Sequence, residues 1–312
     1  MKNKLIQLSL FVIFISLIIN PKIIASSMNE SIVVFITILF PSIFPFFLIS
    51  DLLINYNFHA ILNKYFSKLN NFLFHTSNSS NFIIIMSMLS GFPSGSKYIK
   101  TLYDKKTLDI DKANYLITFT HFANPLFVLT LTRKIFINSY IPYIILFSHI
   151  FSNIIIGIII RPKKKEIPKN ISFSKPLNFS KALENSITNS INLLIIILGN
   201  TCLFFYISNL FKYYLKLDGI KLVIINGFFD ITKGINSLNN INSSNLFNGI
   251  LILSFLAFGG INIHMQVLNI IGDSKINYKN FIFGRISQLA ISITLFYTIY
   301  KLIWINIGFR KW

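Results

Sequence analysis

The residues with the clearest chemical potential interrupt an apolar run. The stretch GFPSGSK, residues 91–97, directly follows the apolar segment 81–90. Its glycines and proline break a helix, so freed backbone amides must face protein, water or a ligand. Serine caps and the first N–H groups of the next helix form an anion site, and lysine adds a positive charge. We therefore predict a solute site at Ser94, Gly95, Ser96 and Lys97. The alternative is an ordinary helix break with a lysine that reaches the membrane surface.

A second polar turn, GFFDITKG over residues 227–234, joins a carboxylate, a hydroxyl and a lysine. Asp230 and Lys233 stand three residues apart, so a structural ion pair is one interpretation if this turn is helical. In the other, Asp230 binds a coupling cation or a proton, while Thr232 and Lys233 face the solute.

Two longer apolar runs are also broken by polar residues. Pro125 removes one N–H group and Asn124 offers a donor and an acceptor beside it, while the Gly259-Gly260 pair unwinds a second helix. A packed kink and close helix packing are the structural alternatives. The added solute-site candidates are Asn124, Pro125, Gly260, Asn262 and Gln266, and the further ion-coupling candidates are His121 and His264.

Composition defines the environment of these residues. The chain has 312 residues, is 53% hydrophobic and 12% charged, and has a mean hydropathy of +0.63. Soluble domains carry about 25% charged residues, so we predict a polytopic membrane protein. Its net charge of +19 comes from Lys and Arg that cluster between apolar runs. There they orient helices, so no nucleic-acid partner is expected.

Apolar runs predict the fold class: an all-α polytopic membrane protein of about seven transmembrane helices plus two re-entrant half-helix hairpins. Two runs, 81–90 and 221–229, are too short to span, since ten helical residues rise only about 15 Å. The full spans are expected at 5–20, 31–54, 113–132, 136–160, 184–209, 247–271 and 281–305.

The two halves of the chain resemble each other, which predicts inverted-topology repeats. FFLISDL at 46–52 matches FFYISNL at 204–210, and a helix break follows each hairpin lysine after 27 residues. Residues 161–181 form a basic linker that we place in the cytoplasm, which puts the C-terminus outside. The predicted units are an uncleaved helical anchor at 1–27, a first repeat at 28–160 with a hairpin around 81–106, the linker, and a second repeat at 182–312 with a hairpin around 221–240.

These motifs, with LFPSIFPFFLISDLL and GGINIHMQVL, resemble the sporulation integral membrane protein YlbJ family over residues 28–310. The resemblance implies a Gate (nucleoside-recognition) domain related to nucleoside carriers, and a role in moving dipicolinate from mother cell towards forespore. By resemblance, Ser94, Gly95, Lys97, Asn124 and Pro125 fall on the first Gate motif, and Asp230, Thr232 and Gly234 on the second. We expect Glu at position 230 and Asn at position 121 in relatives.

The sequence thus predicts an alternating-access transporter of a small organic solute. The resemblance implies that this solute is an organic anion, with dipicolinate as the candidate, and that the protein lies in the mother-cell-derived membrane around the forespore. A nucleoside-type carrier and a non-transporting scaffold for spore envelope or cortex assembly are the alternatives. We expect no enzyme activity, because H-E-x-x-H, an aspartate dyad and G-x-S-x-G are all missing. No cofactor or metal is expected; the expected partners are the solute, membrane lipids and further copies of the chain.

Overall fold

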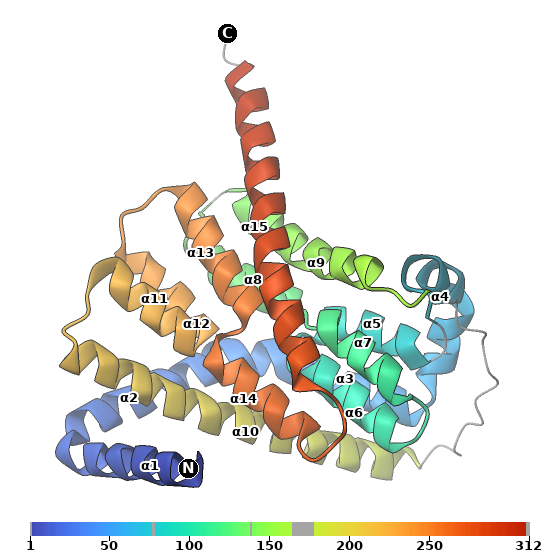
Figure 1. The fold of residues 1–312 in the computed structure, drawn as a ribbon, viewed down its shortest axis with the longest axis horizontal. Coiled ribbons are helices and arrows are strands. Elements are labelled where there is room, and N and C mark those ends of the chain that lie inside the picture. Colours follow the sequence, from blue (N-terminus) through green and yellow to red (C-terminus); the bar gives the residue numbers. More distant parts are fainter. Residues whose placement is uncertain (1, 77–78, 138, 164–177, 310–312) are drawn as a thin grey trace.

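The fold is built from helices joined by short connections (Figure 1). The computed structural model describes residues 2–76, 79–137, 139–163 and 178–309, and this part contains no β-strand. The predicted all-α class is therefore confirmed. Its α-helices are α1 (Lys2–Ile19), α2 (Pro21–Val34), α3 (Phe40–Asn55), α4 (Phe58–Phe74), α5 (Ser79–Ser90), α6 (Ser94–Asp104), α7 (Ile110–Phe119), α8 (Pro125–Thr132), α9 (Ile141–Ile159), α10 (Phe179–Tyr214), α11 (Gly219–Phe229), α12 (Ile231–Ser237), α13 (Asn245–Phe258), α14 (Gly260–Ile271) and α15 (Tyr278–Phe309).

Five helical stretches in the described residues are long and apolar enough to cross a membrane: Pro21–Asn55, Ile141–Ile159, Phe179–Tyr214, Asn245–Ile271 and Tyr278–Ile303. The first continues through a π-helical turn, Phe35–Leu39, that joins α2 to α3. The expected spans at 5–20 and 113–132 correspond to shorter helices. The first is α1, and the second is divided between α7 and α8 because the backbone unwinds over 120–124. The chain is a polytopic membrane protein.

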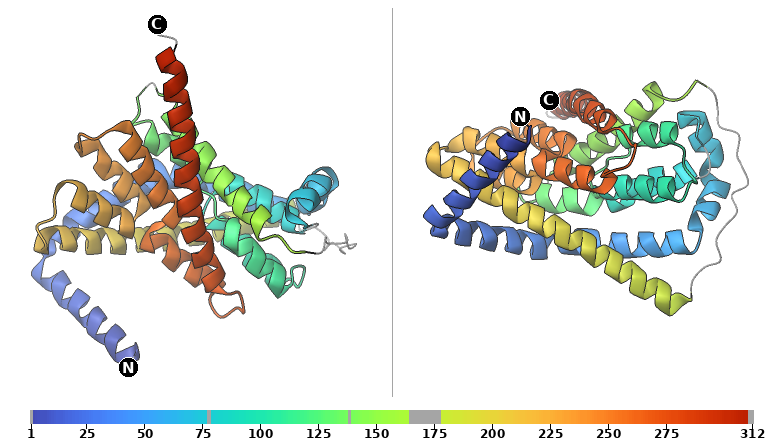
Figure 2. Two further views of the ribbon diagram at one scale, coloured as in Figure 1. Left: turned by 45° about the horizontal axis from the view of Figure 1, so that its top comes forward. Right: turned by 60° about the horizontal axis from the view of Figure 1, so that its bottom comes forward.

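The two halves run through the same order of elements in opposite directions. A long helix (α2–α3 or α10) precedes a short helix pair (α5–α6 or α11–α12), a broken pair (α7–α8 or α13–α14) and a final helix (α9 or α15). In Figures 1 and 2, α2–α3 and α10 lie side by side with opposite chain direction, and the two short pairs lie towards opposite ends of α10. Each short pair is a hairpin whose tip lies near the middle of the molecule.

Local chemistry explains where the four helices break. Gly91 has a φ of +77° and Gly259 one of +94°, which L side chains rarely adopt, so glycine ends α5 and α13 there. Asn124 caps the first N–H groups of α8, and Pro125 occupies the first helical position. Asp230 caps α12 in the same way.

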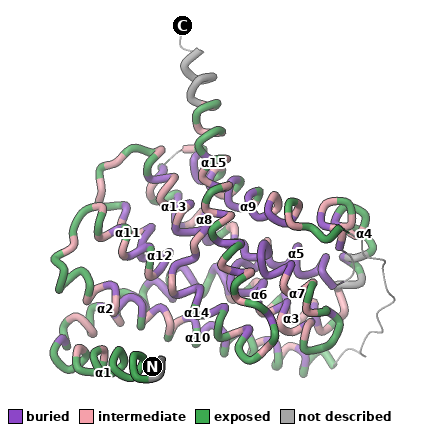
Figure 3. The backbone as a smooth tube through the Cα atoms, in the orientation of Figure 1, coloured by how far each residue is buried: buried purple, intermediate pink, exposed green. Residues whose placement is uncertain are grey.

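Burial is concentrated around these breaks (Figure 3). The hairpin helix α5 is almost wholly buried, although its sequence is only twelve residues long. In contrast, α1 is exposed along most of its length and projects from the body (Figures 2 and 3). Its contacts with α10 include a hydrogen bond of 2.9 Å between the Ser16 and Tyr206 hydroxyls, and Asn20, directly after α1, donates one of 2.9 Å to the Tyr214 hydroxyl. The first hairpin and α12 of the second thus lie in the interior, α11 is only partly buried, and α1 lies at the periphery.

Helix α4 lies between α3 and the first hairpin. Arg161, at the start of the basic linker, donates hydrogen bonds of 3.2 and 3.3 Å to the carbonyl oxygens of Phe72 and Leu73. A cation there satisfies carbonyls at the helix C-terminus. The linker positions 164–177 lie outside the described residues, as do Arg310 and Lys311 at the C-terminus.

Candidate functional site

The four helix breaks meet at a central cavity of about 30 Å³. Both hairpin tips and both broken pairs contribute to its wall, together with the π-helical turn and α10. Its polar lining residues are Asn124, Thr201, Asp230, Thr232, Asn262 and Gln266, and its apolar ones are Leu39, Ile43, Phe92, Phe127, Ile197, Ile231 and Ile263. The cavity therefore combines hydrogen-bonding groups with aromatic and aliphatic surface.

Asp230 is the centre of the polar side of this cavity. Its Oδ1 accepts a hydrogen bond of 3.0 Å from the Lys233 backbone N–H, and its Oδ2 accepts one of 2.6 Å from Asn262 Nδ2. Asn262 also donates to Thr201 Oγ1 at 3.2 Å, and its Oδ1 accepts from Gln266 Nε2 at 2.8 Å. A chain of amides and a hydroxyl thus links hairpin, broken helix and α10.

In the first half, Asn124 lines the cavity at the break before α8. Its Oδ1 accepts hydrogen bonds of 2.8 and 3.1 Å from the backbone N–H groups of Leu126 and Phe127. Its Nδ2 donates one of 2.8 Å to the carbonyl oxygen of Leu89, near the end of α5. One side chain therefore caps α8 and ties the broken pair to the hairpin.

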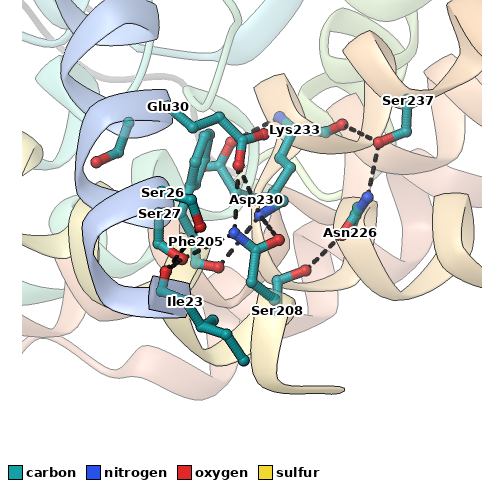
Figure 4. Close-up of polar contacts among 12 residues, drawn as sticks. Ile23, Ser26, Ser27, Glu30, Phe205, Ser208, Asn226, Asp230, Lys233 and Ser237 are labelled. Atoms are coloured by element: carbon teal, nitrogen blue, oxygen red, sulfur yellow. Dashed lines mark hydrogen bonds and ion pairs between the residues drawn. The ribbon is translucent and has the colours of Figure 1, made fainter. Parts of the chain in front are cut away.

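The two hairpin lysines point away from the central cavity. The Lys97 ammonium lies 3.6 Å from Asp51 Oδ1 and 5.8 Å from the Phe47 ring centroid. The Lys233 ammonium contacts Asn209 Oδ1 at 2.7 Å, the Phe205 carbonyl oxygen at 3.1 Å and Glu30 at 3.3 Å (Figure 4). The structure thus places both lysines against the long helices α3 and α10.

These lysine contacts are equivalent in the two halves. Phe47 and Asp51 of FFLISDL match Phe205 and Asn209 of FFYISNL. The same alignment pairs Ser50 with Ser208, and both are hydrogen-bonded to the residue seven before the hairpin lysine. Ser50 contacts Ser90 at 2.9 Å, and Ser208 donates to Asn226 (Figure 4). The halves therefore share contacts as well as element order.

The remaining predicted residues lie behind the cavity wall and pack against the residues that form it. Ser94 donates a hydrogen bond to the Gly91 carbonyl oxygen, Gly95 packs against the Thr120 carbonyl oxygen, and Ser96 is buried. Pro125 begins α8, and Gly260 packs against the Phe229 and Asp230 backbone. Of the predicted set, the structure brings Asn124, Asp230, Thr232, Asn262 and Gln266 together at the cavity, and it places Ser94, Gly95, Ser96, Lys97, Pro125, Lys233, Gly260, His121 and His264 outside its lining.

The two histidines have different surroundings. The His121 ring stacks on Phe92 with 5.0 Å between centroids, one layer behind the cavity wall. His264 Nε2 donates to the Phe258 carbonyl oxygen at 2.9 Å, and its Nδ1 accepts from the Tyr278 hydroxyl at 2.6 Å. His264 therefore satisfies a carbonyl at the C-terminus of α13, where the second helix breaks.

Arg285 performs the same task at the first break, a role that the sequence did not reveal. Arg285 and Gln288 lie one turn apart on α15, and both are buried. The acceptors of Arg285 come from four other residues and could be found only in the folded chain. They are the carbonyl oxygens of Thr118 and His121 and the side-chain oxygens of Asn153 and Gln288.

The arrangement can bind a small polar species, and the described residues contain no group of three or more His, Cys, Asp or Glu side chains placed to hold a metal ion. Helices of this length, with two buried breaks between shorter helices, define a multi-pass integral membrane protein.

Comparison with known proteins finds a curated relative. The chain is 24% identical over 292 residues to the sporulation integral membrane protein YlbJ of Bacillus subtilis (strain 168), which covers 80% of this chain and 71% of that protein. The chain is therefore similar to a YlbJ protein. No protein-family model matches the chain, so the Gate domain stays a prediction. No solved structure matches it either.

Proposed function

We propose that this protein is an alternating-access carrier that moves a small organic solute across a membrane of a sporulating cell. The observation that carries the proposal is the convergence of four helix breaks, from two halves of opposite direction, on one polar cavity. Carriers bind solutes at broken helices between inverted repeats, because unwound backbone is tolerated only where it lines a cavity or is covered by protein. The sporulation setting rests on the name of the relative.

The size of the cavity supports a closed state in this mechanism. A volume of about 30 Å³ holds water molecules or one small ion, and it cannot hold a ring with two carboxylates. A solute would therefore enter only after a hairpin and its broken helix move apart. The placement of the hairpins towards opposite ends of α10 (Figure 1) supports opening on alternate sides.

An organic anion, with dipicolinate as the first solute to test, is the favoured substrate class. The Lys233 side chain lines a second pocket, of about 240 Å³, with Glu30, Asn209 and Lys212. Lys97 is one-fifth exposed at the equivalent place in the first half. Cations beside both hairpins attract anions to the two ends of the pathway. We propose no covalent chemistry and no enzyme activity.

A nucleoside-type carrier is the second candidate, and one observation favours it. The central cavity presents amides, hydroxyls and one carboxylate beside Phe92 and Phe127, without a lysine or arginine among its described lining residues. Such a surface suits a neutral ring with several hydroxyl groups.

Uptake into proteoliposomes separates these candidates. The purified protein is reconstituted, and uptake of labelled dipicolinate and labelled uridine is measured with each solute in competition with the other. We expect saturable dipicolinate uptake, reduced in Lys233→Met and unchanged in Lys68→Met, which removes an exposed lysine of α4. Uptake of uridine alone would select the nucleoside carrier.

A scaffold would transport neither solute. It also predicts that Asn262→Leu, which removes the polar bridge between Asp230 and Thr201, leaves spore formation intact. Absence of uptake together with normal sporulation of that variant would refute the carrier proposal.

A further inference from the structure

The charge balance of the central cavity is the starting point. Asp230 is the one charged side chain among the described residues that line it, and it is 4% exposed. The nearest candidate counter-charge, Lys233 three residues later, directs its ammonium to Glu30, Asn209 and the Phe205 carbonyl oxygen. The Lys233 ammonium therefore acts on Asp230 only through space, and a buried charge without a directly paired counter-charge is costly. The cavity therefore favours a species that carries positive charge.

Hydrogen bonding to Asp230 favours its ionised form. Both carboxylate oxygens accept N–H bonds, Oδ1 from the Lys233 backbone and Oδ2 from Asn262. N–H donors stabilise a carboxylate more than a carboxylic acid. Asp230 also caps α12, whose N-terminal N–H groups favour a negative charge. A separate cation balances this charge without removing any of these bonds, whereas protonation would weaken them.

A second, independent observation points to the same ligand. Gln266 is 2% exposed and lines the cavity, and its Oε1 is buried without a hydrogen-bond partner, although its Nε2 is bonded to Asn262. The hydroxyl oxygens of Thr201 and Thr232 lie on residues of the same wall. Carboxylate, amide and hydroxyl oxygens are the ligands that hard cations select. An unpartnered amide oxygen and a carboxylate without a direct ion pair, on two residues that line one cavity, form a cation-binding combination.

We infer that the central cavity binds one sodium ion through Asp230 and the Gln266 amide oxygen when the carrier is closed. The cavity volume of about 30 Å³ matches an ion with at most a water. One carboxylate balances one positive charge, which selects a monovalent cation over Ca²⁺ or Mg²⁺. The role of the ion rests on the proposed function: the ion neutralises Asp230, so that an anionic solute can bind beside it.

Ion binding is measurable without any solute. The full chain, purified in detergent, is heated in choline chloride, and NaCl replaces it stepwise at constant ionic strength. Because a ligand of the folded state raises the unfolding midpoint, we expect a saturable rise with sodium in the wild type and no rise in Asp230→Asn. Asp51→Asn is the matched control, since it neutralises the carboxylate beside the other hairpin lysine; it should keep the sodium response.

Gln266→Ala gives a second test that keeps every charge. We expect it to raise the half-saturating sodium concentration by at least about tenfold, as loss of a group that holds a metal site does. Equal curves in choline and sodium, or an unchanged response in both cavity variants, would overturn the inference. A midpoint that follows pH alone would overturn it in favour of a proton.

The two proposals fail separately. Dipicolinate uptake that continues unchanged without sodium, together with a flat sodium titration, removes the ion site and leaves the carrier. A sodium response in a protein that takes up neither solute supports the ion site and removes the carrier.

Discussion

Replacing Gly95 by alanine will push the first hairpin away from the first helix break. A Cβ atom at this position would lie 2.2 Å from the Thr120 carbonyl oxygen and 3.3 Å from Ser87 Cβ. The nearer obstacle is backbone, so it cannot rotate aside. Overpacking of this kind costs about 1–3 kcal/mol, and a rigid obstacle sets the cost near 3 kcal/mol. The higher helix propensity of alanine offsets at most about 1 kcal/mol of this cost. The expected net loss of unfolding free energy is therefore about 2 kcal/mol.

Gly199 provides the matched control for this prediction. It lies inside α10, and a Cβ there would meet nothing within 4 Å. Gly199→Ala should raise the unfolding free energy by about 1 kcal/mol, so the two variants should differ by about 3 kcal/mol. Reversible unfolding in mixed detergent and SDS, followed by tryptophan fluorescence, measures both values. Equal stabilities would refute the close packing of α6 against the unwound segment.

Two further predictions concern buried and half-buried cations. Arg285→Leu leaves buried acceptors without donors at a cost of about 1–3 kcal/mol each, so we expect a loss of at least about 3 kcal/mol in the same unfolding assay; a loss under 1 kcal/mol would contradict the network around the first break. The Lys97–Asp51 pair is partly exposed, so a double-mutant cycle with Lys97→Met and Asp51→Asn should give a coupling of about 0.2–1 kcal/mol. A coupling above about 2 kcal/mol would show a buried pair instead.

The sequence was most informative where short-range rules decide the structure. The apolar runs 81–90 and 221–229 predict half-length helices, and α5 and α11 occupy those positions. Glycine and proline also mark the break after each hairpin, because positive φ and a missing N–H group are local properties. Length and backbone chemistry therefore predicted the elements that surround the cavity.

Side-chain direction could not be predicted in the same way. The spacing of Asp230 and Lys233 suggested an ion pair, yet Asp230 bonds the Lys233 backbone N–H and the ammonium contacts Glu30. Glu30 lies 203 positions away in the sequence, and only the packing of α2 against α10 brings it close. Contacts of this range depend on tertiary structure.

The composition of helix α4 does not indicate a helix. Its lysines and asparagines resemble a polar loop, but Ile61, Tyr65, Leu69 and Phe72 recur at helical spacing. The described side chains of these four residues are exposed, so this face has no core residues to identify it. The 3.6-residue periodicity of these four residues is the sequence pattern that indicates the helix.

Helix α10 is long enough to contact residues at both hairpins and at the central cavity. Asn189 on this helix donates to the Asp51 carboxylate that holds Lys97, Thr201 accepts from Asn262 at the cavity, and Asn209 holds Lys233. These three contacts are spread over about 30 Å of one continuous helix. A shift of α10 along its axis by a single turn, about 5.4 Å, would break all three contacts at once. A movement of this helix therefore alters the contacts of both hairpin lysines and of the cavity together.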